Sequence, residues 1–254
     1  MNRTKIEWVK NPDGSQGYTC NSKTGCLNRT PEGLCLGGMF PCYAFRLANG
    51  RLRKRYLANL ILPAHDEADH EAHHSDPFYP RFWPSRLEQI RKRKKPSGIF
   101  LDDMSDWMGE YWPEEWTRAE IQVMRDCPQH RFYTLTKQPQ NLAKFSPFPE
   151  NCWVGVTATG YDAFNKALDY LKYIEATVKF ISIEPLLEAI PFYMERLAYC
   201  GIGWLIIGAQ TKPTVYPKIE WVQEIVSATD HAGIPIFLKD NLYMIKPKRQ
   251  EMPE

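Results

Sequence analysis

Residues 178–187, which read VKFISIEPLL, decide the fold class of this chain. An apolar run that stops at Glu184 and Pro185 is typical of a buried strand that runs into a turn. The same pattern recurs at 99–101, 131–135, 153–156, 204–207 and 236–238. Stretches with the spacing of helices separate these segments, such as the one that starts with Glu114 and Glu115. Strands that alternate with helices predict one parallel sheet covered by helices.

The number of these units favours a particular α/β architecture. The six recurring strands, with another expected near 6–8, suit a TIM-like (β/α) barrel, either complete or partial. We expect residues 1–254 to form a single domain. It would carry a cysteine-bearing loop after the first strand, at about 20–44, and a polar insertion at about 64–80.

Polar side chains follow most of the predicted strands. In β/α barrels the chemistry gathers at the C-terminal ends of the strands. The residues that would converge there are Asp103, Asp106, Lys137, Thr157, Glu184, Gln210 and Lys239. Polar residues also end strands in ordinary turns, so the prediction rests on their convergence and not on any one of them.

Composition excludes several classes of protein. The chain has 254 residues, 43% hydrophobic and 13% aromatic, which is enough for a sizeable core and excludes disordered, collagen-like and minimal disulfide-scaffold proteins. It has no apolar run near the roughly 18 residues that a membrane-spanning helix needs. Its first residues lack the apolar core of a signal peptide. We expect a cytoplasmic protein without a membrane partner.

The net charge of +2 does not demand a polyanionic partner, but the basic residues are clustered. One stretch lies at 46–55 and another at 86–95. Such stretches could contact the phosphates of a nucleic acid. The alternative is that they are solvated helix faces, which is the usual place for charge.

Four of the seven cysteines fall within 23 positions: Cys20, Cys26, Cys35 and Cys42. The other three, Cys127, Cys152 and Cys200, are expected to be small core residues. Three thiolates of the cluster could hold three irons of a cubane and leave the fourth iron open. Alternatively, Cys20 could supply a fourth thiolate to a tetrahedral zinc site, or the thiols could be free.

The polar stretch from His65 to Asp76 is rich in histidine, aspartate and glutamate. Side chains of this kind could bind zinc or another divalent ion. The stretch lacks the fixed two-histidine spacing of an HExxH motif. A solvated insertion is the competing interpretation.

Several short motifs, in order along more than 230 residues, carry a resemblance to a known family. They include 4–8 (TKIEW), 24–26 (TGC), 42–44 (CYA), 104–106 (MSD), 135–137 (LTK) and 182–187 (SIEPLL). In these motifs the chain resembles the phage-associated three-Cys-motif protein family, which is similar to radical S-adenosylmethionine proteins. The resemblance implies a β/α barrel with a cluster loop after its first strand. It also implies a four-iron, four-sulfur (4Fe-4S) cluster held by Cys26, Cys35 and Cys42.

The resemblance further implies that the open iron binds the amino and carboxylate groups of S-adenosylmethionine. We assign cofactor binding to Tyr43, Ser105, Asp106, Thr136, Lys137, Thr157 and Glu184, and substrate binding to Gln210 and Lys239. A structural ion pair between Glu184 and Lys239 is the alternative for those two residues.

Two functions are therefore weighed. The first is a radical S-adenosylmethionine enzyme that needs an electron donor and acts on an unidentified substrate, for which a nucleic acid or a nucleotide would suit the basic stretches. The second is a nucleic-acid-binding protein without catalysis, stabilised by zinc or by an inert cluster.

Overall fold

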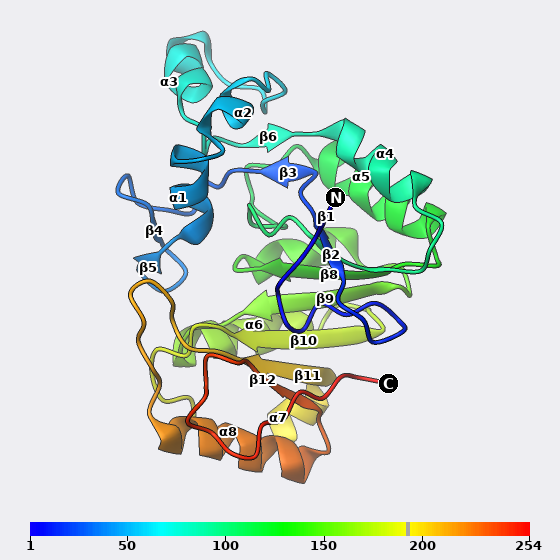
Figure 1. The fold of residues 1–254 in the computed structure, drawn as a ribbon, viewed down its shortest axis with the longest axis vertical. Coiled ribbons are helices and arrows are strands. Elements are labelled where there is room, and N and C mark those ends of the chain that lie inside the picture. The colour runs from blue at the N-terminus through cyan, green and yellow to red at the C-terminus, as the bar shows by residue number, and fades with distance from the viewer. Residues whose placement is uncertain (192–193) are drawn as a thin grey trace.

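The computed structural model of the chain describes residues 1–191 and 194–254 and shows a mixed α/β fold (Figure 1). Its eight-stranded sheet has the order β1-β2-β7-β8-β9-β10-β11-β12. The strands are β1 (Asn2–Arg3), β2 (Tyr18–Cys20), β7 (Gly98–Leu101), β8 (Arg131–Thr136), β9 (Cys152–Thr157), β10 (Val178–Ile183), β11 (Ile202–Ile207) and β12 (Ile236–Leu238). Only the β1–β2 pair is antiparallel among these neighbours. The six recurring strands predicted from the sequence are confirmed.

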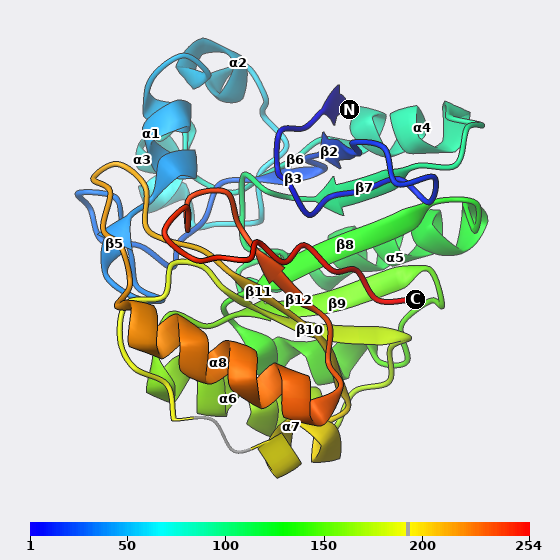
Figure 2. The same cartoon turned by 60° about the horizontal axis from the view of Figure 1, so that its bottom comes forward.

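Helices connect the parallel strands and cover one face of the sheet (Figure 2). They are α4 (Pro84–Lys92), α5 (Glu114–Asp126), α6 (Tyr161–Leu171), α7 (Met194–Tyr199) and α8 (Ile219–Ala232), with the 3-10 helix η2 (Pro139–Phe145) after β8. The apolar spacing in α5 and α6 predicted these helices, because residues three and four apart share a face.

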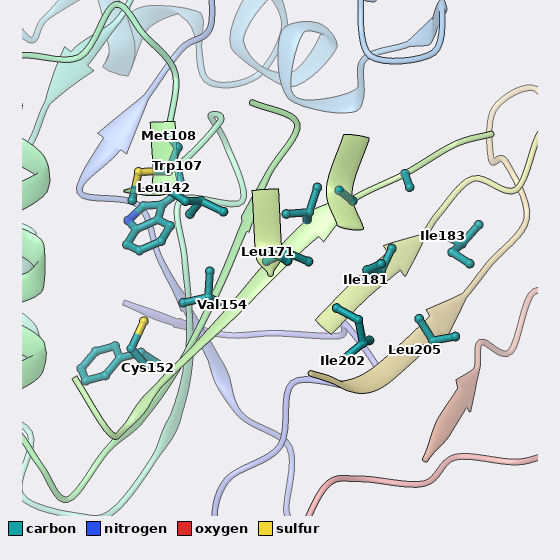
Figure 3. Close-up of a cluster of buried hydrophobic side chains, with 14 of the residues drawn as sticks. Trp107, Met108, Leu142, Cys152, Val154, Leu171, Ile181, Ile183, Ile202 and Leu205 are labelled. Atoms are coloured by element: carbon teal, nitrogen blue, oxygen red, sulfur yellow. The ribbon is translucent and has the colours of Figure 1, made fainter. Parts of the chain in front are cut away.

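The two faces of the sheet carry different side chains. Within each strand, successive residues point to opposite faces, so that Val154 packs under the helices while its neighbour Trp153 lies on the other face. Figure 3 shows the mainly aliphatic core beneath the helices, where Cys152 packs near Val154 and Trp107. Cys127, Cys152 and Cys200 are all buried, as predicted for core residues.

The opposite face is aromatic and is closed by the N-terminal segment. Trp8 is 2% exposed and contacts the rings of Phe100, Tyr133, Phe180 and Trp204. The strand predicted near 6–8 is wrong, because residues 7 and 8 form a turn there. Tertiary packing explains the error, since a turn lets the Trp8 indole enter the aromatic face, whereas an added strand would extend the sheet.

The long connection from β2 to β7 forms a separate layer of short elements, at the top of Figure 1. It contains β3 (Lys23–Thr24), β4 (Leu34–Cys35), β5 (Phe40–Pro41), α1 (Tyr43–Asn49), α2 (Arg53–Leu57), η1 (Glu67–Asp69), α3 (His70–Ser75) and β6 (Arg81–Phe82). β3 pairs with β6, and β4 pairs with β5. The predicted cysteine loop and the polar insertion both lie in this connection, which follows the first parallel strand. Within the described part of the chain, every helix is too short or too polar to cross a membrane.

Candidate functional site

A pocket of about 530 Å³ lies at the C-terminal ends of the parallel strands, under the cysteine loop. The residues that the sequence analysis assigned to the cluster, the cofactor and the substrate all line it: Cys26, Cys35, Cys42, Tyr43, Ser105, Asp106, Thr136, Lys137, Thr157, Glu184, Gln210 and Lys239. These side chains come from six different strand ends and from the loop. The convergence expected from the parallel topology is therefore confirmed.

Backbone hydrogen bonds fix the three cysteines in different elements. Cys26 follows β3, and its N–H donates to the carbonyl of Phe78 at 3.0 Å. Cys35 lies in β4 and is buried. Cys42 precedes α1, where its sulfur accepts from the N–H of Phe45 at 3.5 Å. Each thiol thus reaches the pocket from its own anchored segment.

Cys20 has a different environment. It ends β2, is 1% exposed, and belongs to the hydrophobic core beneath the helices. Its thiol donates to the carbonyl of Arg86 at 3.5 Å, and it does not line the pocket. A four-cysteine site would have to draw Cys20 out of the sheet.

Two close contacts hold the cysteine loop in place. The carbonyl of Gly37 accepts from the Thr159 hydroxyl at 3.1 Å, so the tip of the loop is tied to the end of β9. At Gly25, φ is +92°, and an added Cβ would lie 2.5 Å from the carbonyl oxygen of Tyr79. Only glycine fits this position, because a side chain would both strain the backbone and collide with it.

The electrostatics of the pocket centre on Lys137 and the thiols. Burial raises the pKa of Cys26 to about 12 and also raises the pKa of Cys35. Burial disfavours the charged form of Lys137, but the nearby thiols and Asp106 outweigh it and raise the pKa of this lysine. Lys137 is therefore a cation that faces all three cysteines of the loop.

Asp106 accepts hydrogen bonds from residues at the end of β8. One of its carboxylate oxygens accepts from the Thr136 hydroxyl, and the other accepts from the backbone N–H of Lys137 at 2.9 Å. The carbonyl of Asp106 also accepts from the Trp112 indole at 2.7 Å. These bonds fix where Lys137 leaves the strand and enters the pocket.

The opposite side of the pocket holds an ion pair. The Lys239 ammonium pairs with the Glu184 carboxylate, so the structural alternative weighed for these residues is present.

Gln210 donates to the carbonyl of Pro213 at 3.1 Å. Tyr43 donates its hydroxyl to the carbonyl of Asp103, which ties the start of α1 to the end of β7.

Sequence reasoning missed several pocket residues. Trp8 lines the pocket, and its buried indole N–H has no hydrogen-bond partner. Thr4 and Lys5 also line it, although they entered the sequence argument only as part of the motif at 4–8. No local signal places an N-terminal segment over the pocket, because that position depends on packing across the whole sheet.

The spacing of the thiols bears on which inorganic group they could hold. Over residues 1–191 and 194–254, only three histidines bring their ligand atoms within 4.8 Å of one another as a group of three. Cys26, Cys35 and Cys42 do not form such a group within the described residues. A single zinc ion needs its ligands about 2.0–2.3 Å from one centre, whereas the irons of a cubane are separate centres with one thiolate each.

Comparison with protein families covers almost the whole chain. Residues 3–250 match the family described as "Protein of unknown function (DUF5131)". The chain belongs to the DUF5131 family. Neither a curated protein nor a solved structure matches it significantly. The function of this DUF5131 protein is therefore inferred from the geometry of its pocket.

Proposed function

We propose that this chain is a radical S-adenosylmethionine-type enzyme whose 4Fe-4S cluster is held by Cys26, Cys35 and Cys42. The observation that carries the proposal is the gathering of these three cysteines and the polar strand ends in one pocket. A pocket at the C-terminal ends of parallel strands is where β/α enzymes place their chemistry.

We also propose that the sheet is a partial TIM-like barrel. Seven strands follow one another in sequence order and pair in parallel, from β2 through β7 to β12. Helices cover one face, and the other is filled by aromatic side chains, as the inside of a barrel is filled. Trp8 supplies part of that filling.

The residues around the pocket fit both groups. Three thiols are available for three irons, and Lys137 offsets the negative charge of such a cluster. The unpaired indole N–H of Trp8 is a donor for a bound ligand. When bound, a reduced cluster supplies the electron that breaks the 5′ carbon–sulfur bond of S-adenosylmethionine, and the adenosyl fragment then takes a hydrogen atom from the substrate.

The chain's own residues would bind and orient the cofactor and the substrate. Lys137, fixed by the hydrogen bond from its N–H to Asp106, carries the positive charge that suits a carboxylate. Glu184 and Lys239 offer an acceptor and a donor on the far side of the pocket, where hydroxyl groups of a ribose or a substrate could bind. Phe40 and Phe100 give the pocket an apolar part of its lining.

Metal analysis of the anaerobically purified chain tests the proposal. We expect about four irons and four acid-labile sulfides per chain. The variants Cys26→Ala, Cys35→Ala and Cys42→Ala should lose iron and sulfide. Cys20→Ala is the matched control, because the cluster assignment predicts that it keeps both, while a four-cysteine zinc site predicts that it loses its metal.

Activity is tested with the loaded protein under reducing, anaerobic conditions. We expect 5′-deoxyadenosine to form from S-adenosylmethionine. A chain that holds one zinc ion and no sulfide after reconstitution, and that loses the zinc in Cys20→Ala, would overturn the proposal in favour of a zinc-stabilised binding protein.

A nucleic acid or a nucleotide is the substrate class that we propose. Arg46, Arg51, Arg53, Lys54 and Arg55 are all exposed on α1, α2 and the turn between them. α1 begins directly after Cys42, so this basic surface adjoins the pocket. In the stretch at 86–95, Arg91 pairs with Glu88 and Asp126, whereas Lys92 and Lys94 are exposed.

A further inference from the structure

Three histidines lie together away from the cysteine pocket, in the layer between β2 and β7. His65 precedes η1, while His70 and His74 lie on α3. Their ligand nitrogens are all within 4.8 Å of one another. His70 is exposed, and His65 and His74 are half-buried, so the group is open to an ion from solvent.

The local helix explains how two of the three side chains meet. His70 and His74 are four residues apart, and residues with this spacing share one face of a helix. Their rings stack with centroids 4.0 Å apart. The His65 ring lies 5.6 Å from the ring of His70 and 5.7 Å from that of His74, across from the same helix face.

A hydrogen bond already orients His65 as a ligand. Its Nδ1 lies 2.9 Å from the carbonyl of Pro63. Because a carbonyl oxygen can only accept, Nδ1 carries the proton, and Nε2 keeps its lone pair free. A bond of this kind from the second ring nitrogen is the usual support of a metal-binding histidine.

Buried side chains hold α3 in place beneath the three rings. The guanidinium of Arg81, which is fully buried, donates to the carbonyls of His73 and His74 at 3.5 and 3.3 Å and to that of Asp76 at 2.8 Å. His73 itself stacks on Tyr79, with ring centroids 3.9 Å apart. The end of the helix is therefore held in place by Arg81. The three side chains would have to rotate for their nitrogens to reach the roughly 2.0–2.1 Å from one ion that zinc requires.

We propose that His65, His70 and His74 form a three-histidine site for a divalent transition-metal ion of the zinc class, separate from the cysteine pocket. Imidazole nitrogens suit zinc, copper and nickel, and three of them leave the fourth position of a tetrahedral ion to water. The ion joins α3 to the segment before η1. It thereby braces the connection that carries Phe78, whose carbonyl accepts from the N–H of Cys26.

Titration of the full chain with Co²⁺ and Zn²⁺ tests the site, with Co²⁺ as the spectroscopic probe. We expect one ion to bind with the visible bands of a nitrogen- and oxygen-ligated cobalt and without a thiolate-to-cobalt charge-transfer band. His70→Ala and His74→Ala should each weaken binding by more than about 100-fold, because loss of an outer-sphere partner alone costs 10–100-fold. His231→Ala, at an exposed histidine on α8, is the control and should bind as the natural chain does.

Two results would overturn the site. One is unchanged affinity in the double variant His70→Ala/His74→Ala. The other is a thiolate charge-transfer band together with loss of binding in Cys26→Ala, which would assign the ion to the cysteine loop. Zn²⁺ should also raise the thermal midpoint of the natural chain but not that of the double variant, since a ligand that binds only the folded state stabilises it.

Discussion

The Lys239 ammonium pairs with the Glu184 carboxylate and so joins the ends of β12 and β10, two strands that β11 separates. Both residues line the pocket, and their side chains are 15% and 28% exposed. Gly208 at the end of β11 makes room for the pair, because a Cβ there would lie 2.9 Å from the Lys239 side chain and 3.1 Å from Glu184. The ion pair thus spans β11, where Gly208 has no side chain that would separate the two residues.

We predict that Glu184→Gln and Lys239→Met reduce catalysis more than stability. A partly exposed ion pair contributes at most about 1 kcal/mol to folding, whereas loss of a charged group that contacts the ligand acts on the reaction itself. Formation of 5′-deoxyadenosine should fall by about tenfold or more, equivalent to at least about 1.4 kcal/mol, with little change in the thermal midpoint. The control is Lys95→Met, which breaks the surface pair with Asp13. A lower midpoint with an unchanged rate would make the pair purely structural.

We predict that Gly25→Ala removes the cluster from the chain. The new Cβ would meet the carbonyls of Tyr79 and Phe78 at 2.5 and 2.6 Å, and Phe78 is the residue that anchors the N–H of Cys26. Gly14→Ala is a matched control, because Gly14 has a similar φ of +78° but nothing within 4 Å of an added Cβ. The Gly14→Ala variant should lose only about 1–2 kcal/mol of folding stability, from backbone strain, and should keep its iron. Equal iron content in the two variants would contradict this explanation of Gly25.

Local patterns were enough to predict the sheet and much of the pocket. A buried strand such as β10 is a mostly apolar segment that ends at Glu184, so the residues of the segment itself predict the strand. Parallel topology alone then brings Lys137, Glu184 and Lys239 to one edge of the sheet. Which of these side chains pair with one another depends on how several strands are arranged in space, so no single segment of sequence predicts the pairs.

Long-range packing explains what the sequence did not reveal. Trp8 adopts a turn because the aromatic face of the sheet receives its ring, and the residues of that face are distributed over strands far along the chain. Lys23 is fully buried beside Glu120, at 2.9 Å, although lysine is normally exposed. Its burial depends on the carboxylates of Asp102, at the end of β7, and of Glu120 on α5. The residues around position 23 do not identify these two partners.

We predict that Asp102→Asn changes how stability depends on pH. Asp102 and Glu120 face one ammonium, that of Lys23, in a fully buried cluster. Burial and the neighbouring Glu120 raise the pKa of Asp102 well above its ordinary value of 3.8. The folded chain therefore keeps a proton that the unfolded chain loses, and the stability contributed by this group falls as pH rises above 3.8.

Denaturant unfolding at several pH values checks the sign. Relative to Asp102→Asn, the natural chain should lose free energy of unfolding as pH rises above 3.8. Asparagine suits the site, because φ is +61° there and its amide oxygen can still accept from the N–H of Lys23. Asp126→Asn is a control with the opposite sign in a lower pH range: hydrogen bonds from Gln122 and Arg91 lower the pKa of Asp126, so the stability that this group contributes is lost only as pH falls below 3.8. Parallel pH profiles for the natural chain and Asp102→Asn would show that Asp102 is ionised in the fold.

We predict that the exposed basic residues of α2 contact phosphates. The triple variant Arg53→Ala/Lys54→Ala/Arg55→Ala should bind a labelled single-stranded oligonucleotide more weakly, with a smaller salt dependence. Each lost phosphate contact lowers the slope of log affinity against log salt by about 0.7 for single strands. The control is Lys92→Ala/Lys94→Ala, which removes exposed charge from the other basic stretch. Because both variants lower the net charge, an equal loss of binding would indicate a general charge effect, whereas a loss confined to the α2 variant would place the nucleic acid on α2.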